Sequence, residues 1–268
     1  MTDNLRAFLN GHKDLIEKED YASLYKIIPS NTTARGLTAE LTALLVSCGA
    51  EPWLELETIP PSFIATVEEV ESIVVTKKTK TIQPTGLAYC PSLKSIIFNT
   101  TFDKLPKNCC SDNPNLTSVT GHNATNFGDN CFSDCPQLVD VGSLEATRYI
   151  GVGAFMRTGL TTVKLGDDAV ICASAFRECT KLDTLELGAY LVRDGAFSSC
   201  FALKNVILTN PLGTLSEDTF DGCSSLTEVT FVGTKEQFNK MNKSHEWRGS
   251  APISVIHCSD GNIRLKVR

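Results

Sequence analysis

Apolar residues recur along most of this chain in a pattern with a period of 21 to 23 residues. The clearest unit reads Ala-Phe-x-x-Cys-x-x-Leu and occupies residues 175–182 and 196–203; it returns with Thr in place of Ala at 219–226 and with Cys in place of Ala at 131–138. The Cys position of the unit is filled at seven places: Cys90, Asn113, Cys135, Thr158, Cys179, Cys200 and Cys223. So regular a series identifies an internal repeat.

Each unit also predicts one short strand. Apolar residues follow the Leu position by three and by five residues, as at Val163 and Leu165, so that apolar and outward-facing positions alternate with a period of two. The second apolar residue is missing in two units, at Gly121 and Ser143, and residues 73–75 supply an additional first strand. One unit cannot enclose its own apolar face, so successive units must stack as a solenoid of about eight coils.

The two strongest columns of the repeat have different roles in this solenoid. We expect the Phe column to fill the wider side of each coil. The Cys column requires a small side chain just past a turn, where it can bond a neighbouring backbone group. Five cysteines are therefore predicted to be buried small hydrophobes with a weak donor: Cys90, Cys135, Cys179, Cys200 and Cys223.

These units resemble the signature of the leucine-rich repeats, and specifically of their bacterial BspA-like (treponemal-type) branch. The resemblance covers roughly residues 70–232. It implies a right-handed curved solenoid that binds other proteins or surfaces and carries no catalytic residues. The chain departs from the pattern at Cys110, which stands for Phe, and at residues 158–160, which are one residue short. Both departures are expected to change only the local curvature.

Residues 1–66 lack the repeat and are predicted to be helical. Leu5 to Ile16 present one apolar stripe at helical spacing, Asp20 is a candidate N-cap, and Gly49 is a candidate left-handed C-cap. This region carries most of the net negative charge. Two interpretations remain open, a cap that covers the first coil or a docking module with an acidic face. The segment resembles small helical lead-ins that precede BspA-like repeats in gut bacteria and their phages.

The repeat pattern is not recognisable in the sequence after Phe231. Residues 234–241 predict a short helix, 253–258 a strand and 259–262 a turn into a last apolar segment. A terminal coil needs such a closing element, because an exposed strand edge invites unwanted pairing. The predicted fold class is α+β: a leucine-rich-repeat β-solenoid at 67–232, preceded by a small all-α N-terminal cap at 1–66 and followed by a C-terminal cap at 233–268.

Composition narrows the functional classes. The chain has 268 residues, 42% of them hydrophobic, and a net charge of −6, which favours a packed core and argues against a nucleic-acid partner. No apolar run is long enough to span a membrane. The first residues show no secretion signal, so we expect a cytoplasmic protein with reduced cysteines, or alternatively a virion component.

Catalytic and metal-binding chemistry is not indicated. The four histidines are scattered, and the eleven cysteines lack the paired spacing of a zinc site. His257 and Cys258 are neighbours on a predicted strand and should therefore point to opposite faces. No glycine-rich phosphate loop follows a strand. We therefore expect no enzyme activity, no metal and no cofactor.

The outward strand positions form the candidate partner-binding face. This column is rich in Thr, mixed in charge and without aromatic or Arg anchors, so a solvated β surface is as compatible with it as a binding site. The candidate residues are Lys94, Ser95, Ile97, Ser118, Thr120, Asp140, Thr162, Lys164, Thr184, Glu186, Asn205, Ile207, Glu228 and Thr230.

The predicted function is a non-enzymatic recognition scaffold that binds a protein or glycan along this face. The alternative is a structural or accessory part of a larger assembly, such as a phage particle, docked through the acidic N-terminal helices. A secreted adhesin is disfavoured by the missing signal.

Overall fold

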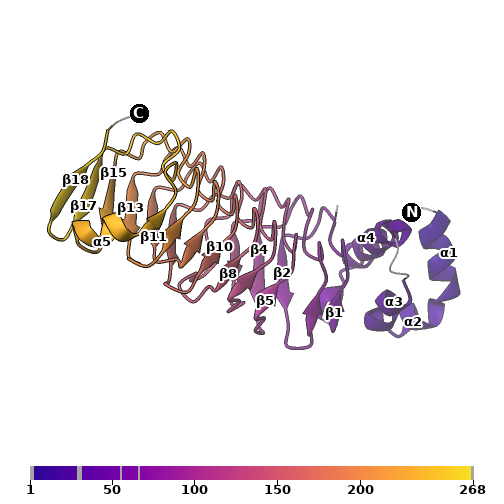
Figure 1. The fold of residues 1–268 in the computed structure, drawn as a ribbon. Coiled ribbons are helices and arrows are strands. Elements are labelled where there is room, and N and C mark those ends of the chain that lie inside the picture. The colour runs from indigo at the N-terminus through magenta and orange to yellow at the C-terminus, as the bar shows by residue number, and fades with distance from the viewer. Residues whose placement is uncertain (1–2, 29–31, 55, 66, 267–268) are drawn as a thin grey trace.

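The computed structural model describes residues 3–28, 32–54, 56–65 and 67–266 (Figure 1). The chain forms a long stack of coils, with a group of helices at the N-terminal end and the C-terminus at the opposite end. This confirms the predicted α+β solenoid with a small helical segment in front of it.

The helical segment comprises α1 (Asp3–Gly11), α2 (Lys13–Glu17), α3 (Tyr21–Ile27), α4 (Thr32–Ser47) and the 3₁₀ turn η1 (Pro52–Leu54). The single stripe predicted over Leu5 to Ile16 is divided between α1 and α2, with a break at His12. Asp20 caps α3 as predicted, since its Oδ1 accepts a hydrogen bond from Ser23 N at 3.1 Å. Gly49 follows α4 in the left-handed region with φ of +83°.

Most coils contribute one long strand and one two-residue strand, and the two kinds of strand form separate sheets. The long strands are β2 (Ser72–Val75), β4 (Ser95–Phe98), β6 (Ser118–Thr120), β9 (Thr162–Leu165), β11 (Thr184–Leu187), β13 (Asn205–Leu208), β15 (Glu228–Phe231) and β17 (Val255–Cys258). They form a three-stranded sheet, β2-β4-β6, and a six-stranded sheet that runs from β9 through β17 to the antiparallel β18 (Gly261–Arg264). A single bridge between Ser118 and Asp140 stands where the coil between β6 and β9 would supply a strand.

The two-residue strands lie on another side of the coils. Two of them, β1 (Thr58–Ile59) and β3 (Thr81–Ile82), pair at the N-terminal end. The remaining seven form one sheet, called here the second sheet: β5 (Lys104–Leu105), β7 (Asn126–Phe127), β8 (Tyr149–Ile150), β10 (Val170–Ile171), β12 (Leu191–Val192), β14 (Thr214–Leu215) and β16 (Asn242–Lys243).

The coils extend further than the expected 67–232 range at both ends. At the N-terminal end, β1 pairs with β3 at the same 23-residue spacing as the repeats, although its segment lacks the Cys position. At the C-terminal end, β16 and β17 continue both sheets. Helix α5 (Lys235–Lys240) is inserted there, so that Thr214 pairs with Asn242 and the 22-residue period disappears from the sequence.

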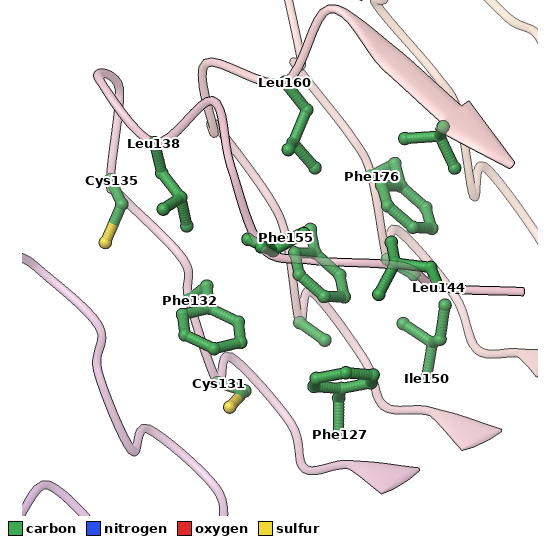
Figure 2. Close-up of a cluster of buried hydrophobic side chains, with 14 of the residues drawn as sticks. Phe127, Cys131, Phe132, Cys135, Leu138, Leu144, Ile150, Phe155, Leu160 and Phe176 are labelled. Carbon is green, nitrogen blue, oxygen red and sulfur yellow. The ribbon is translucent and has the colours of Figure 1, made fainter. Parts of the chain in front are cut away.

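The Phe column forms a continuous stack inside the coils. The rings of Phe132, Phe155, Phe176, Phe197 and Phe220 follow one another with centroids 5.3, 5.1, 5.1 and 5.9 Å apart. Figure 2 shows the start of this stack, with Phe127 and the cysteines of the same coil beside it. Trp247 of the C-terminal segment closes the stack by packing edge-on against Phe220. The stack thus joins the interiors of successive coils into one core.

The side chains of the Cys column form the predicted hydrogen bonds to neighbouring backbone groups. Cys179, Cys200 and Cys223 are fully buried, and each thiol donates to the carbonyl of the Phe-position residue one coil earlier, at 3.1 to 3.2 Å. Asn113 takes the place of Cys in its coil. Its side chain accepts from Cys90 N at 2.8 Å and donates to the Leu87 carbonyl at 2.8 Å. Cys and Asn side chains of this column thus bond backbone groups of the preceding coil.

The C-terminal segment closes the solenoid as a capped helix and a hairpin. Thr234 and Gln237 form a reciprocal capping box at the start of α5. Strand β17 pairs with β15 and then with β18, which turns back along it. The predicted helix, strand and turn are all present in this order.

Candidate binding surface

Twelve of the fourteen candidate residues lie at the outward-facing positions of the long strands, a surface that we call the strand face; Lys94 directly precedes β4, and Asp140 forms an isolated bridge with Ser118. In-register pairing lines these positions up from coil to coil; Lys164 lies beside Glu186, and Glu186 beside Ile207. None of the candidate residues is buried. Whether these residues bind a partner stays a prediction.

The N-terminal part of the strand face carries hydroxyl and apolar side chains. Ser72, Ser95 and Ser118 lie in register, with Ser95 Oγ donating to Ser72 Oγ at 2.8 Å. Val74 and the exposed Ile97 form the adjoining column. This part of the face offers hydroxyl groups and apolar side chains, and the exposed ion pair between Lys94 and Glu71, with Nζ and Oε1 2.7 Å apart, lies at the start of the same strands.

Charged residues of the central part are paired across coils. Lys164 Nζ lies 3.5 Å from both Glu145 Oε1 and Glu186 Oε1, and these carboxylates raise the pKa of Lys164. Lys204 lies 3.6 Å from Asp183 in the same way. Because these pairs are well exposed to solvent, they contribute little to stability and fix the spacing of charges along the face.

At the C-terminal end the face contains residues that the sequence did not assign to it. His257 follows Thr230 in register, and its Nε2 lies 2.8 Å from Glu228 Oε2. The hydrogen bond to Glu228 raises the pKa of His257. Asn262 of β18 is the next residue in that column. The inserted helix α5 hid this register, because the spacing from β15 to β17 exceeds the repeat period.

A hollow interrupts the strand face between β6 and β9. It has a volume of about 290 Å³ and is lined by residues 139–145 together with Leu160 and the first part of β9. Three candidate residues, Asp140, Thr162 and Lys164, line it. The exposed Val139 stands at its rim. The missing apolar position at Ser143 explains the hollow, since this coil forms no complete strand there.

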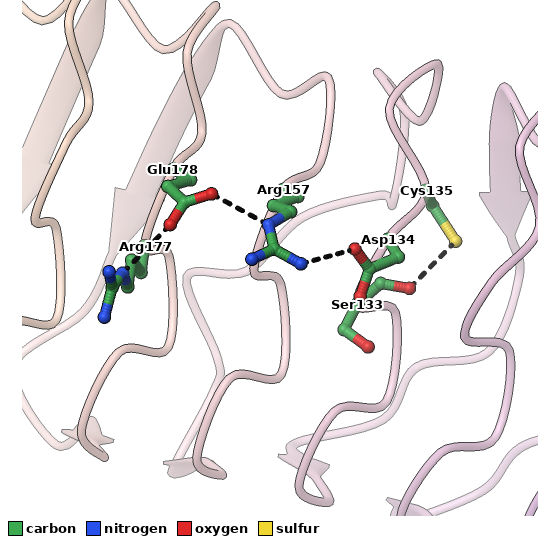
Figure 3. Close-up of polar contacts among 6 residues, drawn as sticks. All are labelled: Ser133, Asp134, Cys135, Arg157, Arg177 and Glu178. Carbon is green, nitrogen blue, oxygen red and sulfur yellow. Dashed lines mark hydrogen bonds and ion pairs between the residues drawn. The ribbon is translucent and has the colours of Figure 1, made fainter.

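A second polar feature, missed in the sequence, lies along the turns on another side of the coils. Arg157 donates to Asp134 at 3.0 Å and to Glu178 at 2.8 Å, and Arg177 also reaches Glu178 (Figure 3). The bond from Arg157 lowers the pKa of Glu178 and raises that of Arg157. These residues link three coils. Asp134, Arg157 and Glu178 are separated by one repeat period each, so their spacing in the sequence could have indicated that they lie side by side on successive coils.

Metal-binding groups and membrane-spanning helices were sought among the described residues. Within them, no group of three or more His, Cys, Asp or Glu side chains could hold a metal ion. The described helices also include none with the length and apolar character needed to cross a membrane. Burial raises the pKa of Cys135 to about 12, so this thiol remains protonated and unreactive.

The comparisons with known proteins match the geometry. The model of the BspA type leucine-rich repeat region matches residues 57–183 and 169–245, with six copies. A leucine-rich repeat protein from Bacteroides ovatus ATCC 8483 is similar in structure, with 25% identity and a TM-score of 0.56 over 66% of this chain. This chain spans 46% of that protein's length.

A leucine-rich cell surface protein from Faecalibacterium prausnitzii A2-165 is more distant, with 11% identity and a TM-score of 0.37 over 70% of this chain and 60% of that protein. No curated protein matches the sequence. The family match covers well over half of the residues and agrees with the stacked Phe and Cys columns. The chain belongs to the BspA-type leucine-rich repeat family.

Proposed function

We propose that this chain is a non-enzymatic protein-binding scaffold whose partner lies along the strand face. The observation that carries the proposal is the continuity of this face: outward side chains stand in register from β2 to β6 and from β9 to β17. The parallel ladders hold these side chains at fixed spacing, so a partner would meet a surface that needs little ordering on binding.

The hollow between β6 and β9 gives the otherwise flat strand face a concave site. Protein partners anchor in concave sites, where a side chain can lose its contact with water. Here the exposed Val139 offers apolar contact, and Asp140, Thr162 and Lys164 offer polar groups around it. We place the centre of the contact at this hollow.

Exchanging the charges of one pair tests the proposal without breaking that pair. The variant Lys164→Glu/Glu186→Lys keeps opposite charges at these two positions beside the hollow but exchanges them, and it removes the contact of Lys164 with Glu145. Captured from an extract of the cell that makes the protein, the partner should bind this variant at least tenfold more weakly than the wild type, as measured by quantitative mass spectrometry.

The matched control exchanges another exposed pair, in Arg157→Glu/Glu178→Arg, which lies along the turns and away from the strand face. It should capture the same protein as the wild type. If the Lys164/Glu186 exchange leaves capture unchanged, the partner site lies elsewhere, and the acidic N-terminal helices become the next surface to test.

A further inference from the structure

The coil between β6 and β9 forms no backbone hydrogen bond with the strand that follows it. In the next coil such bonds are present at both ends of the strand. At the start of β11, Thr184 N donates to Thr161 O at 3.2 Å. Just after β11, Gly188 N donates to Leu165 O at 2.9 Å. Among the described residues, no backbone hydrogen bond joins β9 to residues 139–145. The edge of β9 that faces the hollow is therefore open.

The sequence of the interrupted coil explains this open edge. Gly142 has φ of +69°, a left-handed conformation that breaks an extended strand. Its N–H bonds Asp140 Oδ1 at 2.9 Å. The extended path thus ends near Asp140, whose own N–H still bonds Thr117 O at 3.2 Å in the coil before. The interrupted coil continues the ladder of β6 at this one point and leaves β9 without a neighbour.

The open edge presents backbone donors and acceptors at the spacing of a strand. Along a strand, the N–H and C=O groups of alternate residues point to opposite edges. Thr161 O and Leu165 O accept hydrogen bonds from the next coil. The backbone groups of Thr162 and Lys164 therefore point the other way, and both residues line the hollow. Such a row of unpaired groups is what an extended peptide uses to add itself to a sheet.

The position of this edge within the stack selects its occupant. An edge at the end of a sheet is open to another folded sheet. This edge instead lies inside the stack, because the sheet that ends at β9 is followed across the gap by the sheet β2-β4-β6. A second folded sheet cannot approach it, whereas a single extended segment can enter the hollow of about 290 Å³ from the strand face.

We propose that an extended segment of the partner protein pairs with the open edge of β9 and takes the place of the missing strand. The inference rests on the proposed function, since it names the form in which the partner meets the strand face. Main-chain hydrogen bonds hold the segment, and its alternate side chains point into the hollow and out to solvent.

The charges around the hollow define the segment further. Asp140 and Glu145 contribute two carboxylates, against the one ammonium of Lys164, which leaves one net negative charge. A neutral or basic segment therefore meets less repulsion here than an acidic one. Residues 202–209 of this chain, which include β13, contain Lys204 and no acidic residue. A synthetic peptide of this sequence, acetylated and amidated at its ends, is a suitable probe.

Amide hydrogen exchange followed by NMR on the whole chain tests the proposal. In the free protein the amides of Thr162 and Lys164 should exchange quickly, whereas those of Val163 and Leu165, on the edge paired with β11, should be protected. The peptide should slow exchange at Thr162 and Lys164 by about tenfold or more. Two N-methylated peptides, with the methyl groups on odd or on even residues, should differ in affinity by a similar factor, because only one set blocks the paired edge.

Three variants of the protein separate the backbone from the side chain. Thr162→Pro removes an N–H that makes no bond in the ladder, so it should leave thermal unfolding unchanged and weaken peptide binding by about tenfold or more. The control Thr162→Val keeps this N–H and should bind the peptide as the wild type does. Thr184→Pro removes the N–H that bonds Thr161 O, so it should lower the melting temperature.

Slow exchange at Thr162 and Lys164 in the free protein would overturn the proposal, because the edge would then already be covered by the chain itself or by a second copy. Unchanged exchange at millimolar peptide, equal affinity of the two methylated peptides, or undiminished binding by Thr162→Pro would overturn it as well. None of these results affects the proposed function if the Lys164/Glu186 exchange still weakens partner capture. The proposed function fails only if that exchange leaves capture unchanged.

Discussion

Removing one ring from the Phe stack should destabilise the solenoid far more than removing an exposed ring nearby. Phe176 is fully buried and lies between Phe155 and Phe197, with both centroid distances 5.1 Å and the rings within 5° of parallel. Phe176→Ala therefore deletes a ring held on both faces and leaves a cavity that the flanking coils cannot fill. Such substitutions cost about 3–5 kcal/mol.

The magnitude can be read from thermal unfolding. For a chain of this size, 1 kcal/mol shifts the melting temperature by about 2–4 °C, so Phe176→Ala should lower it by about 6–20 °C. The control is Phe201→Ala, because Phe201 is 50% exposed and lies outside the stack. Its effect should stay within about 0.5 kcal/mol. Calorimetry of both variants checks the difference. Equal shifts for the two variants would refute the claim that the stack stabilises the coils.

Three further predictions follow from single groups. With a thiol reagent, the native protein should react only at the exposed Cys48 and the half-exposed Cys258, whereas the unfolded protein should show eleven free thiols; native disulfides would contradict this. Asn113→Ala leaves a buried backbone N–H and two carbonyls without this partner, so the free energy of unfolding should fall by at least about 2 kcal/mol in urea titrations. Glu228→Gln should return the pKa of His257 towards 6.5 in an NMR titration. Because the pKa of His257 is raised in the folded protein, the ion pair stabilises the fold below the unfolded-state pKa. This stabilisation disappears as the pH rises through the folded-state pKa.

The repeat could be predicted from sequence because its requirements recur at every level. Most rings of the Phe column pack against a ring of the next coil, and cysteines of the Cys column donate to a carbonyl of the preceding coil. Both constraints act at constant spacing, so they leave a period in the sequence. The outward direction of the candidate residues follows from the same alternation.

The ends and the interruptions could not be predicted in this way. Helix α5 lengthens one coil, so the register that brings His257 beside Glu228 depends on tertiary packing rather than on a period. His122 lies in the loop between β6 and β7, yet it is buried, and its Nε2 bonds the Val141 carbonyl at 2.9 Å. Burial lowers its pKa. The imidazole lies in the region where the apolar strand positions at Gly121 and Ser143 are missing.

The pairing of charged side chains on the surface was the hardest feature to predict from the sequence. The sequence shows which side chains are charged, but the pairs of Lys164 and Arg157 depend on which residues of neighbouring coils stand in register. The cytoplasmic or virion location and the domain limits stay predictions.

Hydrogen–deuterium exchange of the partner complex tests the central claim most directly. Partner binding should slow amide exchange in the loop at 139–145 and in the flanking strands β6 and β9. Exchange in the helices at 3–47 should change little. Slower exchange confined to those helices, with the strands and the loop unaffected, would contradict it and would make the N-terminal segment the docking module.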